Sequence, residues 1–268
     1  MAAQQAKPEH GRGGAFRVYK VGGPALEDPQ LLLPLAAELK RASGPVVVVH
    51  GGGRHIERML ERLGIESHFV EGRRVTSAEA MDVVEMVLSG SMNKGLAAGL
   101  SAAGLPSVGL SGRDGGLLRA RLEPGLGRVG TPEQVDVTPL LALWDAGFVP
   151  VVAPVSSGPN GEAVNVNADE AALGLARALA ARSLVYLSDV DGVRVSGAPV
   201  SRLTKDEAER RIADGTIAGG MVLKVRVALA ASAAGIPEVV VAGRARLEGR
   251  FAGTVIQTAD VIAVEVEQ

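Results

Sequence analysis

Two periodicities alternate along this chain, one typical of strands and one typical of helices. Short apolar runs rich in valine and leucine predict strands at residues 16–21, 46–49, 107–110, 148–154, 184–187 and 238–241. Between them, apolar residues recur at helical spacing, as in Ile56, Met59, Leu60 and Leu63, and Gly64 follows where a helix should end. This alternation predicts an α/β fold, an open αβα sandwich with a mainly parallel central sheet.

Local signals predict where other helices begin. Asp28 and Pro29 have the residue types of an N-cap and a first helical position, and Thr76 with Glu79 forms a capping-box pattern. Further helical stretches are expected from Asn93, over residues 171–181, and after the glycine-rich segment 215–220.

Pattern changes along the chain predict two lobes. Residues 1–14 are polar and glycine-rich, without an apolar signal or anchor segment, and are expected to form a flexible N-terminal tail. A boundary near Arg182 would separate a lobe at 15–181 from a second lobe at 182–268. No apolar run reaches the roughly 18 residues that span a bilayer, so we expect a cytoplasmic protein without a membrane segment.

Composition excludes several classes of function. The 268 residues include 28 basic and 30 acidic side chains, and a net charge of -2 provides no field that attracts nucleic acid. The absence of cysteine excludes disulfides and thiolate metal sites. His50 and His55 flank a glycine turn without an acidic cluster to complete a metal cage, so no protein-held metal is expected. Motifs of P-loop, dinucleotide-binding and serine-hydrolase proteins are also absent.

Two glycine loops can bind phosphate. Gly22 and Gly23 follow one predicted strand, and Gly51, Gly52 and Gly53 follow another. Without a Cβ, backbone N–H groups can approach phosphate oxygens closely. The alternative is that each glycine pair is an ordinary turn.

Several charged and polar side chains lie next to these loops or at strand ends. Lys20 lies within the first strand and Lys224 near a helix start, where each can bind an anion, although an edge lysine or an exposed helical lysine is the alternative. Asp169 can orient two lysines or simply cap a helix. Arg74 can bind a carboxylate through two N–H groups or be solvated.

The motifs in their order resemble the amino acid kinase family, most closely its acetylglutamate kinases. The resemblance covers residues 16–256 and rests on YKVGG (19–23), VVVHGGG (47–53), GRRVT (72–76), VVEMVLSGSMNK (83–94), GLSGRDG (109–115), NVNAD (165–169), LSDVDGV (187–193) and GGMVLKV (219–225). Arg73 departs from it, because these proteins commonly carry leucine there.

The resemblance implies that ATP phosphorylates the γ-carboxylate of N-acetyl-L-glutamate, a step of arginine biosynthesis. It implies that Lys20 and Lys224 neutralise the transferred phosphoryl group and that Asp169 holds both lysines. Substrate would bind Gly51, Gly52, Gly53, Arg74 and Asn165; phosphate and nucleotide would bind Gly22, Gly23, Ser188, Asp189 and Gly220. Magnesium would be held mainly by the ATP phosphates.

The same resemblance implies a homodimer with an N-terminal amino-acid lobe and a C-terminal ATP lobe. The tail lacks the apolar helix of arginine-inhibited hexamers, so feedback inhibition by arginine is not expected. Two alternatives stay open, namely a kinase for carrier-protein-bound aminoadipate or glutamate in lysine biosynthesis, and a non-catalytic amino-acid-binding regulator.

Overall fold

A computed structural model of the chain describes residues 16–22, 28–70, 72–195 and 197–258. Its centre is an eight-stranded sheet. The strands follow the order β14 (Arg202–Thr204), β16 (Thr254–Gln257), β15 (Glu238–Ala242), β11 (Ser183–Leu187), β1 (Arg17–Val21), β2 (Val46–His50), β8 (Val149–Ala153) and β5 (Ser107–Ser111). The predicted N-terminal tail lies outside the described residues.

The six apolar runs predicted as strands are all strands of this sheet. Neighbouring strands are parallel throughout, except that β15 and β16 are antiparallel. The mainly parallel sheet is therefore confirmed. The predicted boundary near Arg182 falls just before β11, and β11 pairs with β1 along its whole length, so the sheet continues across that point.

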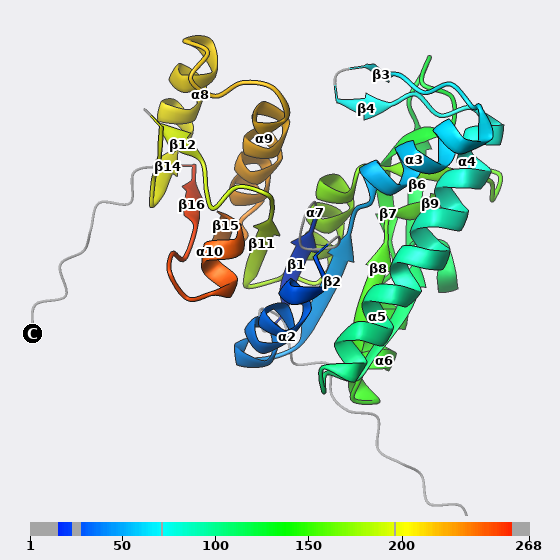
Figure 1. The fold of residues 1–268 in the computed structure, drawn as a ribbon, viewed down its shortest axis with the longest axis horizontal. Coiled ribbons are helices and arrows are strands. Elements are labelled where there is room, and N and C mark those ends of the chain that lie inside the picture. The colour runs from blue at the N-terminus through cyan, green and yellow to red at the C-terminus, as the bar shows by residue number, and fades with distance from the viewer. Residues whose placement is uncertain (1–15, 23–27, 71, 196, 259–268) are drawn as a thin grey trace, which may run out of the picture.

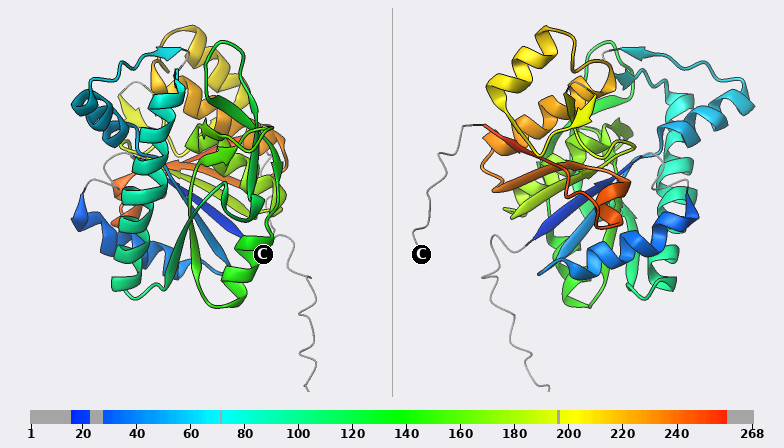
Figure 2. Two further views of the ribbon diagram at one scale, coloured as in Figure 1. Left: turned by 90° about the vertical axis from the view of Figure 1, so that its right-hand side faces the viewer. Right: turned by 60° about the vertical axis from the view of Figure 1, so that its left-hand side comes forward.

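Helices cover both faces of the sheet, as Figures 1 and 2 show. Helices α6 (Thr138–Asp145), α7 (Ala168–Ala178) and α9 (Gly220–Ala233) share one hydrophobic cluster with the sheet, and α8 (Lys205–Ala213) packs beside α9. Helices α2 (Leu32–Arg41), α5 (Asn93–Ala102) and α10 (Arg244–Leu247) contribute to the cluster on the other face. This arrangement confirms the αβα sandwich.

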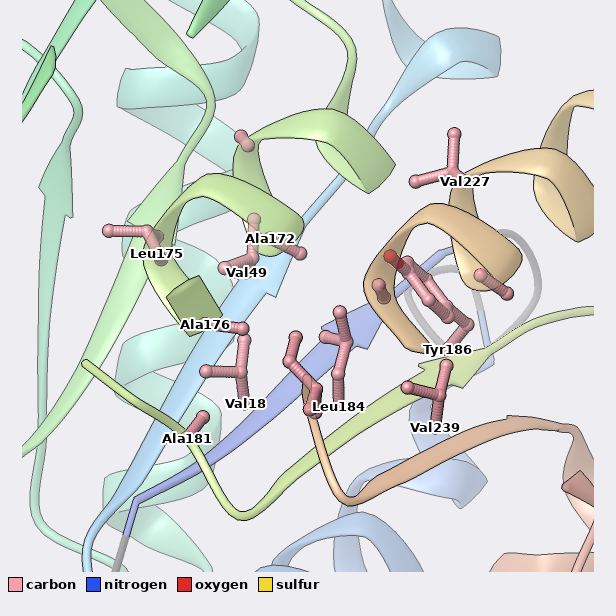
Figure 3. Close-up of a cluster of buried hydrophobic side chains, with 14 of the residues drawn as sticks. Val18, Val49, Ala172, Leu175, Ala176, Ala181, Leu184, Tyr186, Val227 and Val239 are labelled. Atoms are coloured by element: carbon pink, nitrogen blue, oxygen red, sulfur yellow. The ribbon is translucent and has the colours of Figure 1, made fainter. Parts of the chain in front are cut away.

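The core under α7 and α9 consists of valine, leucine and alanine side chains together with the buried ring of Tyr186 (Figure 3). Val18 on β1 and Val49 on β2 are fully buried below the alanines of α7. Small residues on that helix let it lie close to the sheet, which brings the first turn of α7 near the carboxyl ends of β1 and β2.

A second group of strands was not predicted, whereas the two helices beside it were expected, one over residues 56–63 and one after Thr76. Strands β6 (Leu118–Leu122), β7 (Val129–Val135), β9 (Val155–Ser157) and β10 (Ala163–Val166) form a small closed barrel beside α3 (Gly53–Leu63) and α4 (Ala78–Glu85). Two hairpins project from the main body, β3 (Phe69–Val70) with β4 (Arg73–Arg74), and β12 (Arg194–Val195) with β13 (Ala198–Pro199). Short 3-10 turns occupy Pro29–Leu31 and Asp114–Gly116. The hairpin strands and β9 escape prediction because they are short, and β7 escapes prediction because it carries several polar residues.

Helix starts agree with the predictions in part. The chain turns helical at Pro29, where Asp28 Oδ1 accepts the N–H of Gln30, and α3 ends at Gly64 with a φ of 69°. The capping-box prediction at Thr76 is wrong, because Ser77 caps α4 by accepting the N–H of Ala80. Thr76 is instead fully buried.

Between α4 and α5 the helix continues through a π-helical segment, Met86–Met92. Helix α5 then begins at Asn93, as predicted. Among the described residues no helix has the length and apolar character needed to cross a membrane.

Candidate functional site

The candidate site lies at the carboxyl ends of β1 and β2. Strand β1 is the switch point of the sheet, because β2 lies on one side of it and β11 on the other. Open α/β sheets bind ligands at such points. A cavity of about 240 Å³ opens there. It is lined by Lys20, Gly22, Gly51, Gly52, Gly53, Ile56, Phe69, Gly72, Arg73, Arg74, Leu88, Val129, Pro154, Asn165, Val166, Asn167, Ala168 and Asp169.

Asp169 lies between two lysines that come from distant parts of the chain. Lys20 Nζ is 2.8 Å from Asp169 Oδ1, and Lys224 Nζ is 3.4 Å from Asp169 Oδ2. The three side chains are between 10% and 14% exposed, so their charges are poorly screened by water. Two cations and one anion leave a net positive charge beside the cavity, and such a charge favours the approach of an anion.

The titration of these groups reflects their burial. Burial by itself would raise the pKa of Asp169, but the positive charges of Lys20 and Lys224 outweigh it and hold that pKa below its ordinary value. Burial, followed by the charge of Lys20, lowers the pKa of Lys224, and Asp169 opposes that effect. Asp169 is therefore ionised at neutral pH and supports the ammonium form of Lys224.

The alternative roles for these residues do not agree with the geometry. Lys20 is on a central strand rather than at an edge, so its ammonium reaches the carboxyl end of the sheet. Asn167, not Asp169, caps α7, because its side chain accepts the N–H of Asp169. The Asp169 carboxylate is thereby left to pair with the lysines.

The two glycine loops differ in what their N–H groups already bind. Gly22 donates its N–H to Leu187 O, and Gly51 donates its N–H to Val21 O. Each N–H is thus occupied. A Cβ on Gly22 would lie 2.8 Å from Lys20 Nζ, whereas a Cβ on Gly51 would make an ordinary contact with Ala168 at 3.7 Å. Gly23 lies outside the described residues.

Gly52 and Gly53 begin α3 beside the cavity. Within the part of the chain that the structure describes, no protein acceptor takes the N–H of either residue, as is usual in the first turn of a helix. A Cβ on Gly52 would lie 2.6 Å from Leu88 Cδ2, whereas Gly53 has open space. Two N–H groups and the positive end of the helix therefore face the cavity.

Arg74 and Asn165 also line this cavity. Arg74 is buried; its Nη1 donates to Glu57 and Ser67, its Nη2 donates to Gly53 O at 3.2 Å, and its guanidinium lies 4.6 Å from the Phe69 ring centre. The alternative that the Arg74 side chain is solvated is therefore wrong.

Asn165 is held by the barrel. Its Nδ2 donates to Thr76 Oγ1 at 3.1 Å, and its backbone N–H donates to Arg128 O. This contact also explains why Thr76 is buried instead of capping α4.

Arg73 and Glu170 are site residues that sequence reasoning missed. Arg73 Nη2 donates to Glu170 Oε1 at 2.5 Å, and its Nη1 lies 3.7 Å from Glu123 Oε1. Burial raises the pKa of Glu170, against the opposing charge of Arg73. The available signal was the pair of adjacent arginines in a short strand, because neighbouring strand residues point to opposite sides. Arg74 contacts α3, and Arg73 contacts α7.

Three of the residues expected to bind phosphate and nucleotide, Ser188, Asp189 and Gly220, lie outside this cavity lining, whereas Gly22 is part of it. Ser188 and Asp189 follow β11 directly, and Ser188 Oγ donates to Asp189 Oδ1 at 3.0 Å. Gly220 begins α9, the helix that carries Lys224. The charge of Asp189 acts to raise the pKa of Lys224, so the residues after β11 interact electrostatically with that lysine.

Among the described residues, no group of three or more histidine, cysteine, aspartate and glutamate side chains is arranged to hold a metal ion. His50 is fully buried and bonded to Asn93 and to the backbone. The donors present at the cavity are lysine and backbone N–H groups, which suit an anion.

Comparison with known proteins agrees with this geometry. The model of the amino acid kinase family matches residues 15–243. An acetylglutamate kinase of Rubrobacter xylanophilus is 47% identical over 92% of this chain and 93% of its own length. An acetylglutamate kinase of Geobacillus kaustophilus is 43% identical over 91% of this chain and 97% of its own.

Solved structures share the fold. The protein smu.665 of Streptococcus mutans UA159 superposes with a TM-score of 0.81 at 26% identity, over 91% of this chain and 99% of its own. The N-acetylglutamate synthase of Neisseria gonorrhoeae, in complex with coenzyme A and N-acetyl-glutamate, superposes with a TM-score of 0.76 at 25% identity, over 92% of this chain and 60% of its own. By sequence over most of its length and by fold, the chain belongs to the amino acid kinase family.

Proposed function

We propose that this chain transfers the γ-phosphoryl group of ATP to the γ-carboxylate of N-acetyl-L-glutamate, the acetylglutamate kinase step of arginine biosynthesis. The observation that carries the proposal is the placement of Asp169 between Lys20 and Lys224, at 2.8 and 3.4 Å, near the glycines Gly52 and Gly53 that begin α3 and line the same cavity. The relatives that share 43% to 47% of their residues with this chain are acetylglutamate kinases.

The reaction needs charge neutralisation more than proton transfer. An oxygen of the acceptor carboxylate attacks the γ-phosphorus of ATP, the bond from that phosphorus to the β–γ bridging oxygen breaks, and ADP leaves. The carboxylate is already ionised at neutral pH, so no general base is required. Lys20 and Lys224 neutralise negative charge on the transferred group, and Asp169 holds both ammonium groups in place.

The acceptor would bind between Arg74 and the glycine loop. Three of the five N–H groups of Arg74 are occupied by Glu57, Ser67 and Gly53, which leaves Nε and one N–H of Nη2 for the α-carboxylate. The Asn165 amide lies at the same wall. The α-carboxylate of the acylated amino acid would then contact Arg74, and its γ-carboxylate would lie near the two lysines.

In this proposal the nucleotide binds on the side of Lys224 that faces away from the acceptor. Residues 15–181 would form the amino-acid lobe, and residues 182–268 would form the ATP lobe with Ser188, Asp189 and Gly220. Magnesium would be held mainly by phosphate oxygens, which its preference for oxygen ligands allows. A cytoplasmic homodimer completes the proposal.

A substrate comparison tests the proposal. ADP release is measured with Mg-ATP and either N-acetyl-L-glutamate or N-acetyl-L-aminoadipate. The expected result is turnover that is much faster with N-acetyl-L-glutamate. Preference for the longer acceptor would favour the lysine-biosynthesis alternative. Binding of either amino acid without ADP release would identify a non-catalytic regulator.

A further inference from the structure

A buried polar pair lies directly beneath the glycine loop. His50 is the last residue of β2 and Asn93 the first residue of α5, and both are completely buried. Asn93 Nδ2 lies 3.1 Å from His50 Nε2, 2.8 Å from Val151 O and 3.2 Å from Leu110 O. The two hydrogens of the amide nitrogen are thus shared among three acceptors on β2, β8 and β5, which are neighbouring strands.

The hydrogen bonds determine the protonation of His50. Lys94 Nζ donates to Asn93 Oδ1 at 3.2 Å, so the Nδ2 side of the amide faces the strand carbonyls and the imidazole. Because Nδ2 is a donor, His50 Nε2 accepts, and the ring proton lies on Nδ1, 3.0 Å from Gly51 O. Only the neutral Nδ1–H tautomer satisfies both neighbours.

We propose that Asn93 and His50 are positioning residues, which hold the loop Gly51–Gly53 in the conformation that the reaction requires. This inference rests on the proposed function, in which the loop binds the transferred phosphoryl group. The Asn93 amide connects the His50 ring to β8 and β5, and Nδ1–H of that ring donates to the carbonyl of Gly51. The N–H groups of Gly52 and Gly53 follow immediately, so their direction depends on that carbonyl.

Packing around the pair supports the same role. The π-helical segment Met86–Met92 ends at Asn93, and single π turns inside α-helices are frequent at functional sites. From that segment, Leu88 and Met92 occupy the space that a Cβ on Gly52 would need. Gly109 on β5 likewise lacks the space for a Cβ, because Asn93 Oδ1 lies against it. One helical segment therefore contacts the loop from below at several points.

The charges around His50 favour its neutral form. Burial lowers the pKa of His50 to about 4, the hydrogen bond to Gly51 O opposes that effect, and the charges of Lys20 on β1 and Lys94 on α5 lower it further. An imidazolium would place an N–H against the N–H of Asn93. A neutral ring is thus required across the physiological pH range.

The wild-type protein provides the first test. Two-bond ¹H–¹⁵N spectra distinguish histidine tautomers, and the chain has only four histidines, so His50→Gln identifies the signal. We expect His50 to show a protonated Nδ1 and an unprotonated Nε2, unchanged between about pH 8 and pH 5.5. Titration near the ordinary pKa, or an Nε2–H tautomer, would overturn the proposal without any reference to enzyme activity.

The variant Asn93→Asp provides the second test. A carboxylate cannot donate to His50 Nε2 or to the strand carbonyls, and it raises the pKa of His50. We expect kcat with N-acetyl-L-glutamate to fall about 10- to 100-fold, with the KM for ATP changed by less than about threefold. We also expect kcat to recover partly at lower pH, as protonated His50 becomes a donor to the carboxylate.

Matched controls separate positioning from folding and from the function itself. Asn160→Asp adds the same charge at an exposed site, and His68→Gln removes an exposed imidazole; both should leave kcat unchanged. A folded Asn93→Asp variant with wild-type kcat and a flat pH profile would overturn the positioning role. If the wild-type protein phosphorylates neither acceptor, the proposed function fails, and the histidine spectra still decide how the loop is held.

Discussion

Lys224 and Asp169 are 55 positions apart in the chain, yet Lys224 Nζ lies 3.4 Å from Asp169 Oδ2. The contact joins the N-terminal parts of two helices, α9 and α7, which pack on the same face of the sheet. The other oxygen of the same carboxylate faces Lys20 on β1. One anion thus holds two cations, each from a different element, at the mouth of one cavity.

Replacing Lys224 by alanine should reduce kcat by about 10²- to 10³-fold, because the variant loses a cation that stabilises charge on the transferred group. ADP release under saturating substrates measures the effect. Lys40→Ala removes an exposed lysine of α2 and serves as the control. An unchanged kcat would exclude Lys224 from the reaction.

Asp169→Asn should shift the alkaline limb of the kcat–pH profile to lower pH. Burial and the charge of Lys20 lower the pKa of Lys224, and Asp169 acts to raise it. Without the carboxylate that pKa falls further, so the ammonium form is lost at a lower pH. Profiles are compared with the exposed variant Asp145→Asn. A parallel loss of kcat at every pH would contradict this electrostatic role.

Arg74→Lys should raise the KM for N-acetyl-L-glutamate and leave kcat nearly unchanged. A lysine cannot bond Glu57, Ser67 and Gly53 while also presenting two parallel donors to a carboxylate. Hydrogen bonds to charged groups contribute roughly 1.5–3 kcal/mol, so a rise of about 10- to 100-fold is expected. Arg119→Lys, at an exposed position, is the control, and an equal KM in both variants would remove Arg74 from the acceptor site.

Gly52→Ala should destabilise the protein by about 1–3 kcal/mol, because the new methyl group meets Leu88 and Met92. The φ of Gly52 is 175°, an extended value open to alanine, so the cost is one of packing. Gly53→Ala meets open space at the first position of α3 and should keep or slightly increase stability. Urea unfolding of the two variants compares them directly; equal stabilities would refute the packing explanation.

Stability should fall as the pH decreases from about 6.5 to 4, in part because of His50. Its pKa is about 4 in the folded protein against 6.5 in the unfolded chain, so the unfolded state binds the extra proton in this window. The difference between the two pKa values of His50, 6.5 and about 4, corresponds to about 3 kcal/mol of the free energy of unfolding. Urea unfolding at pH 7 and pH 4.5 should show a smaller loss for His50→Gln than for the wild type.

The local sequence pattern determined much of the fold. Valine-rich runs such as Val46–His50 form strands because β-branched side chains fit a buried sheet, and Gly64 ends α3 because it accepts a positive φ. The glycines after β1 and β2 and the charged residues near them indicated a candidate site. Their likeness to known kinases supplied the reaction.

Other features depend on contacts between residues far apart in the chain. The barrel strand β7, Val129–Val135, carries too many polar residues for a local strand pattern, and its pairing with β6 makes it a strand. The side chain of Arg73 is positioned by its ion pair with Glu170, which lies 97 positions later in the chain. Thr76 has the sequence context of an N-cap, but its burial against Asn165 leaves that role to Ser77.

The sequence by itself determined which residues can carry charge, lack a Cβ or form helices and strands, because those properties are local and chemical. Tertiary structure alone decided which of them meet. The pairing of Asp169 with Lys20 and Lys224 and the tautomer of His50 arise from chain segments brought together by packing. A carboxylate or an imidazole takes its protonation from such neighbours, and no local pattern specifies them.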